Sequence, residues 1–259
     1  MYRLFPTVFA ALLLALLAAP MAHADRRYFV QSYTPYLAPA GNLEFEAFSN
    51  AFLGQGDSSG TAWKNRLEFE YGVSDRLTGA FYFNFVQPAG EGAATTFDGP
   101  SIEVIYRLSE PGQLPVDPAA YLEVRANGNE LEVEPKLLLA KRIYKLVTVM
   151  NVVGEFERIH SGPEAGITEK AFELTGGASR ELGHNFALGL EAVYNRGFAD
   201  QGPDASSVRL GPTINLQSQK VQLAVGWHPQ VWGSPASQGS LNLADFPRSE
   251  VRLILGVEL

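Results

Sequence analysis

The chain contains no cysteine, which excludes disulfide bridges, thiolate metal sites and a lipidated cysteine. Basic residues are also scarce: 20 Lys and Arg stand against 28 Asp and Glu, and the formal net charge is −8. This balance argues against nucleic-acid binding, which requires a basic surface. After the first 24 residues no apolar run reaches the about 18 residues of a membrane-spanning helix, so a helical membrane protein is excluded.

The first 24 residues have the features of an export signal. Arg3 supplies a positive charge, "VFAALLLALLAA" forms an apolar run, and "AHA", from Ala22 to Ala24, fits a small-residue cleavage site. The apolar run is too short to span a bilayer comfortably as a mature helix. We therefore expect residues 1–24 to be a cleaved signal peptide.

The stretch "LEFEYGVSDRLTGAFYFNF" (residues 67–85) shows the dominant pattern of the remaining chain. Apolar and polar side chains alternate on both sides of a short turn, so that Leu67 and Phe69 share one face while Glu68 and Glu70 share the other. Strict alternation with a period of two predicts β-strands that have one apolar and one polar face.

Alternating segments recur along the chain, and most have the roughly 9–11 residues that a tilted strand needs to cross a bilayer. Twelve strands are expected, near residues 42–54, 62–73, 77–86, 100–108, 119–127, 130–141, 146–157, 169–181, 186–196, 207–216, 221–231 and 248–259.

The connections between these segments mostly alternate between tight turns and long loops rich in Gly, Pro, Ser and Asp. Outer-membrane barrels alternate in this way, with short periplasmic turns and longer outer loops. Two joints depart from the alternation: "SEPGQLPVDP" is long where a turn is expected, and "NGN" (127–129) is short where a loop is expected. The Asn-Gly pair in "NGN" favours a hairpin turn because both residues accept positive φ.

A soluble exported barrel or sandwich, for example a lipocalin-like binding protein, would show the same alternation with its apolar face inside. Two features favour a membrane barrel. The expected strands are longer than the about 5–6 residues typical of soluble proteins. The polar face also contains many Gly and Ala residues, which suit a crowded interior. We predict an all-β, transmembrane, antiparallel up-and-down barrel of about 12 strands over residues 42–259.

This prediction assigns each strand residue to one of two surfaces. The expected lumen-lining residues are Glu68, Glu70, Asn84, Glu103, Arg107, Glu123, Arg125, Glu132, Glu134, Lys136, Glu155, Glu157, Glu173, Glu191, Arg209 and Arg252. The expected lipid-facing residues are Phe69, Tyr71, Phe81, Phe83, Phe85, Tyr106 and Trp227.

The stretch "PAGNLEFEAF" (39–48), followed by "LEFEYGVSDRL", resembles the start of a family of outer-membrane β-barrels, and "VRLGPTINL" (208–216) fits a later strand of that family. The family includes barrels of phenol-degradation operons (the MetA-pathway type) and barrels of unknown function described as transporter-like. The resemblance implies a barrel in the bacterial outer membrane and little chemistry. The chain departs from it at Leu259, where such barrels usually end in an aromatic residue.

Twelve tilted strands give a backbone diameter of about 24 Å, which inward side chains reduce to a narrow passage. The inward charges lean acidic by about two to one, which favours cations or neutral solutes over anions. We therefore expect a passive channel for small solutes. The alternatives are a salt-bridged, non-conducting barrel that acts through its outer loops, and the soluble binding protein described above.

Little in the sequence points to catalysis, and we expect no enzyme, cofactor or metal site. His160, His184 and His228 are expected to be surface polar residues, and the acidic loops lack a specific cation-binding pattern. The expected partners are outer-membrane lipid, the barrel-assembly machinery and an unidentified small solute, without nucleic acid. Residues 25–41 are an N-terminal periplasmic segment, a short extra strand or a plug, whose Arg26 and Arg27 would reach acidic lumen residues.

Overall fold

The computed structural model describes residues 27–56, 60–163, 165–199, 203–218 and 220–259. The expected signal peptide (1–24) and Arg26 lie outside the described residues. Among the residues described, no helix is long and apolar enough to cross a membrane. The strands are β1 (Leu43–Leu53), β2 (Thr61–Ser74), β3 (Leu77–Gln87), β4 (Thr96–Arg107), β5 (Asp117–Ala126), β6 (Glu130–Ile143), β7 (Leu146–Ile159), β8 (Thr168–Glu181), β9 (Phe186–Phe198), β10 (Ala205–Gln217), β11 (Val221–Ser234) and β12 (Ser249–Glu258).

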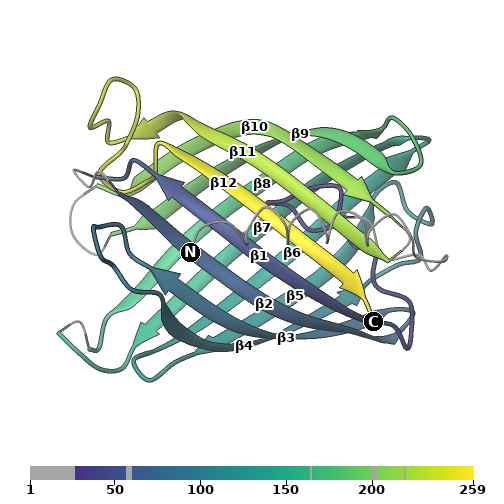
Figure 1. Cartoon of the computed structure of the whole chain (residues 1–259), viewed down its shortest axis with the longest axis horizontal. Helices are drawn as coiled ribbons and strands as arrows, with labels where there is room; N and C mark the ends of the chain where they lie inside the picture. Colours follow the sequence, from purple (N-terminus) through teal and green to yellow (C-terminus); the bar gives the residue numbers. More distant parts are fainter. Residues whose placement is uncertain (1–26, 57–59, 164, 200–202, 219) are drawn as a thin grey trace, which may run out of the picture.

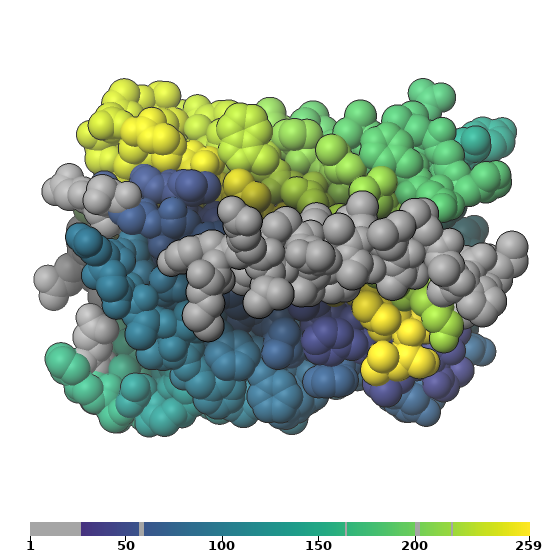
Figure 2. Space-filling view, in the orientation of Figure 1, coloured from purple at the N-terminus to yellow at the C-terminus, as the bar shows by residue number. Residues whose placement is uncertain are grey.

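The twelve strands form one closed barrel in which every strand pairs with its neighbours along the chain, and β1 pairs with β12 to complete the wall (Figure 1). All pairs are antiparallel, and closure leaves no free sheet edge among these strands. The outer surface in Figure 2 shows side chains of the first strands beside those of the last strands. The predicted fold class, an antiparallel up-and-down barrel of about 12 strands, is confirmed.

The largest difference from the expected strand starts is at β4, which begins at Thr96 rather than near residue 100. The sequence "FDGP" looks like a turn, but the strand continues through it with a register shift opposite Phe83 and Phe85 in β3. Gly99 has a φ of 89° in this irregularity, a conformation that glycine adopts without strain. A bulge therefore lengthens this strand where the composition predicted a loop.

The short connection at residues 127–129 forms a hairpin turn, as expected, but by a different mechanism. Neither Asn127 nor Gly128 adopts a positive φ. Instead, the Asn127 side-chain oxygen accepts hydrogen bonds from the backbone N–H groups of Asn129 (2.8 Å) and Glu130 (3.0 Å). The asparagine side chain thus holds the turn, as in an Asx turn.

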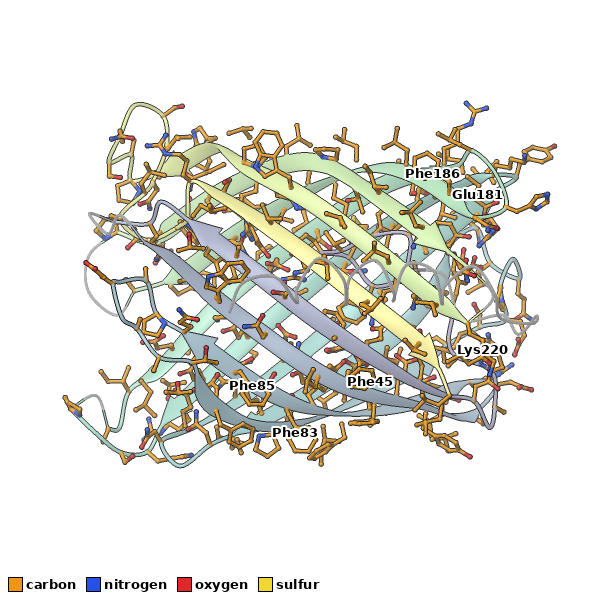
Figure 3. The ribbon with its side chains drawn as sticks, in the orientation of Figure 1. Phe45, Phe83, Phe85, Glu181, Phe186 and Lys220 are labelled. Atoms are coloured by element: carbon orange, nitrogen blue, oxygen red, sulfur yellow. The ribbon has the colours of Figure 1, made fainter. Side chains whose placement is uncertain are left out.

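Large apolar side chains cover the outside of the barrel wall, where Figure 3 shows Phe83 projecting away from β3. Neighbouring rings pack on this surface: Phe81 lies 5.0 Å from Phe83 and Phe45 lies 5.2 Å from Phe69 between ring centroids. An apolar surface that extends around a closed barrel fits a lipid environment rather than water.

The interior is packed, because the segment that precedes β1 lies inside the barrel. Tyr28, Phe29 and Val30 are buried, and each packs against buried side chains of the wall. Tyr33 and Leu37 pack against a third buried cluster, formed by residues of β4, β5 and β6. We call residues 27–38 the internal segment.

Candidate functional site: the barrel interior

The predicted lumen residues lie on the inward face of the wall, either buried or half-buried. They come from ten of the twelve strands and are Glu68, Glu70, Asn84, Glu103, Arg107, Glu123, Arg125, Glu132, Glu134, Lys136, Glu155, Glu157, Glu173, Glu191, Arg209 and Arg252. Whether a solute passes along these side chains stays a prediction.

The predicted lipid-facing residues point away from the interior. Six of them are exposed on the barrel surface: Phe69, Tyr71, Phe81, Phe83, Tyr106 and Trp227. The seventh, Phe85, is half-buried because its ring packs against Phe97 of β4, with centroids 5.6 Å apart. A contact with lipid at these positions remains a prediction.

Glu191 of β9 holds the centre of the internal segment. Its carboxylate accepts hydrogen bonds from the backbone N–H groups of Val30 (2.8 Å), Gln31 (3.1 Å) and Ser32 (2.9 Å). Thr213 of β10 donates a further hydrogen bond to the same carboxylate at 2.6 Å. Three consecutive N–H groups that converge on one carboxylate form a concave anion site, here filled by the protein's own side chain.

Arg27 fastens the start of the internal segment to another part of the wall. Its guanidinium forms a paired contact with Glu46 of β1, with Nη2 2.5 Å from Oε2, and its backbone N–H donates to Gln222 of β11. The guanidinium also lies 3.8 Å from Glu68. Arg27 therefore reaches acidic side chains of the inner wall, as the sequence predicts.

Tyr33 anchors the middle of the internal segment to β7 and β5. Its backbone N–H donates to the Asn151 side chain at 2.7 Å, and its carbonyl accepts from that side chain at 2.9 Å. The Tyr33 ring meets the Tyr121 ring edge to face at 5.3 Å, and the Lys136 ammonium lies within 4.5 Å of both ring centroids. Such cation–π contacts stabilise a buried ammonium.

Glycines in the wall make room for the side chains of the internal segment. A Cβ on Gly177 of β8 would lie 2.8 Å from the Phe29 ring, and a Cβ on Gly226 of β11 would lie 2.4 Å from Val30. Real Cβ atoms do not approach so closely, so these positions require glycine as long as the segment is in place. The small residues on the polar face therefore match the shape of the segment.

The strand register aligns glutamates from neighbouring strands into one row across the inner wall. Each member stands opposite the next in the antiparallel pairing, with Ala80 of β3 interrupting the glutamates, and the row is Glu258, Glu44, Glu70, Ala80, Glu103, Glu123 and Glu134. We call these residues the acidic row. Side chains directly opposite have Cβ atoms about 4.5–5.5 Å apart, and like charges at that spacing destabilise a sheet.

Basic side chains offset part of this charge. Arg66 forms an ion pair with Glu123, and Lys136 lies 2.8 Å from Glu134. Arg125 forms ion pairs with two glutamates outside the acidic row, Glu132 at 2.5 Å and Glu130 at 2.6 Å. Among the predicted lumen residues the basic ones are fewer than the acidic ones, so this set keeps an acidic surplus.

A hollow of about 470 Å³, which includes open solvent, remains beside the internal segment. The segment lines it with Arg27, Tyr33 and Tyr36, and the wall lines it with Glu70 and Gln222, among others. The interior therefore contains a polar hollow next to a packed segment.

The structure corrects the expectation that His228 is a surface residue. His228 is fully buried inside the barrel on β11, with its Nε2 3.7 Å from a carboxylate oxygen of Glu191. Its position in the inward set of the alternation is consistent with this burial. His160 and His184 are exposed, as expected.

The sequence leaves the role of residues 25–41 open and does not identify their partners on the wall. Gln222, Asn151 and Thr175 contact the internal segment, yet nothing distinguishes them from other inward polar residues in the sequence. The signal in the sequence is the set of small residues on the polar face, such as Gly177 and Gly226, which suits a filled interior.

Solved structures of outer-membrane barrels share this fold. An outer membrane channel from Pseudomonas putida F1, described as COG4313, superposes with a TM-score of 0.62 at 14% sequence identity and covers 89% of this chain and 100% of its own. The KdgM porin gives a TM-score of 0.56 at 10% identity, over 83% of this chain and 99% of its own. The NanC porin gives 0.53 at 12% identity, over 84% and 98%. At these identities the likeness establishes the fold alone.

Among curated proteins none matches this chain. A family model matches residues 126–259, from the end of β5 through β12, which is more than half of the chain. This family differs from the phenol-degradation type that the N-terminal motifs resemble. The chain belongs to the protein family described as a family of unknown function, DUF6662.

Proposed function

We propose that the protein is a bacterial outer-membrane channel for small solutes, whose acidic interior favours cations and neutral solutes over anions. The observation that carries the proposal is the acidic row, which places glutamates at matching heights on six strands of the wall. Like charges directly opposite one another cost stability. In a barrel that conducts no solute, this row of like charges would lower stability without serving a function.

Charged side chains that line a narrow pore raise the local concentration of counter-ions and repel ions of like charge. The similarity to outer-membrane channels and porins supports the same general role, because the interior of such barrels is the path for the solute.

In this proposal the internal segment sets the width of the channel. It contacts β1 through Glu46, β7 through Asn151 and β9 through Glu191, so it lies across much of the interior. A solute passes beside the segment, through the hollow that Glu70 and Gln222 line, or passes after the segment has moved.

The second candidate function is a non-conducting barrel that acts through its outer loops. The observation that favours it is the packing of the internal segment, since Phe29 and Val30 are buried against the wall. In that case the charges of the interior hold the segment in place and no solute crosses.

Planar-bilayer recordings distinguish the two functions. The mature chain is expected to give small, steady conductance steps, with a reversal potential in a KCl gradient that shows selectivity for potassium. The variant Glu103→Gln/Glu123→Gln is expected to reduce this selectivity, whereas Glu91→Gln, at an exposed position in the connection between β3 and β4, leaves it unchanged. A mature chain that inserts and gives no conductance steps, also after residues 27–38 are deleted, would contradict the channel.

A further inference from the structure

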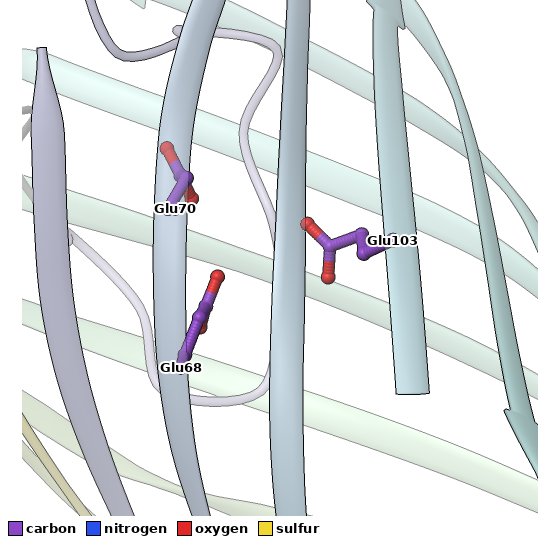
Figure 4. A group of neighbouring side chains, drawn as sticks. All are labelled: Glu68, Glu70 and Glu103. Atoms are coloured by element: carbon purple, nitrogen blue, oxygen red, sulfur yellow. The ribbon is translucent and has the colours of Figure 1, made fainter. Parts of the chain in front are cut away.

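Three glutamates converge at one point of the inner wall. Glu68 and Glu70 project from β2, and Glu103 projects toward them from β4 (Figure 4). One carboxylate oxygen from each residue lies within 4.8 Å of one from each of the others. Two oxygens that bind the same Ca²⁺ at about 2.3–2.6 Å are at most about 5 Å apart, so this spacing allows a single ion to contact all three.

The register explains why the carboxylates meet. Glu70 and Glu103 both stand opposite Ala80 of β3, which lies between them and is too small to separate their side chains. Glu68 is two residues before Glu70 and therefore shares its face. The sequence positions are far apart, and only the pairing of β2, β3 and β4 brings them together.

Three carboxylate oxygens in this group, both of Glu68 and one of Glu103, lack the donors that buried carboxylates require. Glu68 is 0% exposed, and neither of its oxygens has a hydrogen-bond partner among the described residues. Glu103 is also fully buried; one oxygen accepts from the Tyr82 hydroxyl, and the other has no hydrogen-bond partner in the described part of the chain. A buried carboxylate without hydrogen-bond partners is strongly unfavourable, so these groups need a counter-charge, which either a proton or a bound cation supplies.

The nearby guanidinium of Arg27 does not meet this need. It lies 3.8 Å from Glu68, beyond hydrogen-bond distance, and it is paired with Glu46. A second acidic group of the interior, Glu132, Glu155 and Glu157, differs in this respect because a guanidinium is bound to it. Arg125 contacts Glu132 at 2.5 Å and Glu157 at 3.7 Å.

We propose that Glu68, Glu70 and Glu103 bind a divalent cation of the calcium class inside the barrel. Carboxylate oxygens are the ligands of hard cations, and the group contains no histidine or cysteine that would select zinc. Ca²⁺ tolerates irregular geometry and completes its shell of about 6–8 oxygens with water, which the adjoining hollow lined by Glu70 admits. Two positive charges would balance most of the three negative ones.

The site goes beyond the proposed channel function and does not depend on it, since a closed barrel with a packed interior binds the ion equally well. The sequence predicts no metal site. A cation-binding loop can be recognised from a local pattern of residues, and the acidic loops of this chain have no specific pattern of that kind. The cross-strand register assembles the group from two strands instead.

Terbium, which replaces calcium in oxygen sites and emits when nearby tyrosines are excited, provides the test. The Tyr82 hydroxyl bonded to Glu103 places a donor ring beside the site. The mature barrel, folded in detergent, is expected to give saturable terbium emission that CaCl₂ abolishes. Glu68→Gln and Glu103→Gln are each expected to weaken binding at least about tenfold, because ligand charge sets the affinity of such sites.

Two matched variants control for charge and folding. Glu173→Gln removes an inward glutamate of β8 outside both acidic groups, and Glu132→Gln alters the group that contacts Arg125; both are expected to leave calcium-displaceable emission unchanged. Faster migration of unboiled samples on a denaturing gel shows that each variant is folded. Absence of calcium-displaceable binding to the folded barrel, or full binding in folded Glu68→Gln and Glu103→Gln, would overturn the proposal, whatever the conductance.

Discussion

Phe29 of the internal segment and Gly177 of β8 occupy complementary positions, because the ring of Phe29 fills the space where a side chain of residue 177 would lie. A Cβ at position 177 would stand 2.8 Å from the ring. The barrel wall and the segment before it are therefore fitted to one another, which connects the stability of the fold to the state of the interior.

Gly177→Leu is expected to displace the internal segment while the barrel still forms. Trypsin should then cleave more readily at Arg27, and single-channel conductance should rise. The matched control is Gly176→Leu, the neighbouring residue on the outer face, where a Cβ meets nothing closer than 3.5 Å. Equal cleavage and conductance in the two variants would contradict the predicted fit.

Glu191→Ala is expected to release the centre of the internal segment, since the backbone N–H groups of Val30, Gln31 and Ser32 lose their acceptor. Hydrogen bonds to a charged group are worth about 1.5–3 kcal/mol each, and the loss should appear as a lower free energy of unfolding in urea. Glu169→Ala, at an exposed position of β8, serves as the control. A loss of stability no greater than that of the control would show that Glu191 does not hold the segment.

Phe83→Arg is expected to destabilise the inserted barrel by about 2–4 kcal/mol, the cost of an arginine on the lipid face near the bilayer midplane. Phe83 is exposed near the middle of β3. Tyr144→Arg, in the turn between β6 and β7 where residue 144 is 95% exposed, is expected to cost almost nothing. Unfolding measured in lipid vesicles compares the two, and similar stabilities would place Phe83 outside the lipid.

Arg125→Gln is expected to increase selectivity for cations and to lower stability, because Glu130, Glu132 and Asp98 lose their common partner. Reversal potentials in a salt gradient measure the first effect, and urea unfolding measures the second. Arg158→Gln, an exposed residue of β7, is the control. Unchanged selectivity in a folded, conducting Arg125→Gln variant would show that solutes do not sense this part of the interior.

The location of the protein can be tested directly. We expect the native chain in the outer-membrane fraction, where it should migrate faster on a denaturing gel before boiling than after it, as closed barrels do. Recovery in the periplasmic soluble fraction without such a shift would contradict a membrane barrel and would leave the exposed apolar surface, including Phe69 and Trp227, without an explanation.

The alternation of apolar and polar residues is sufficient to predict the strands, their number and the face on which most side chains lie. Glu68 and Phe69 illustrate this: one is buried and the other exposed, as their parity requires. The main error in strand starts, at Thr96, arises because "FDGP" has the composition of a turn, whereas Gly99 allows the strand to continue through a bulge.

The sequence by itself determined the elements and their two faces, because strand formation and side-chain direction follow from a local pattern with a period of two. Only the tertiary structure decided what meets inside the barrel. The convergence of Glu70 and Glu103 across Ala80 depends on the register between three strands, and the contact of Val30 with Glu191 joins residues 161 positions apart. Such long-range contacts follow from closure of the barrel, which no local pattern specifies.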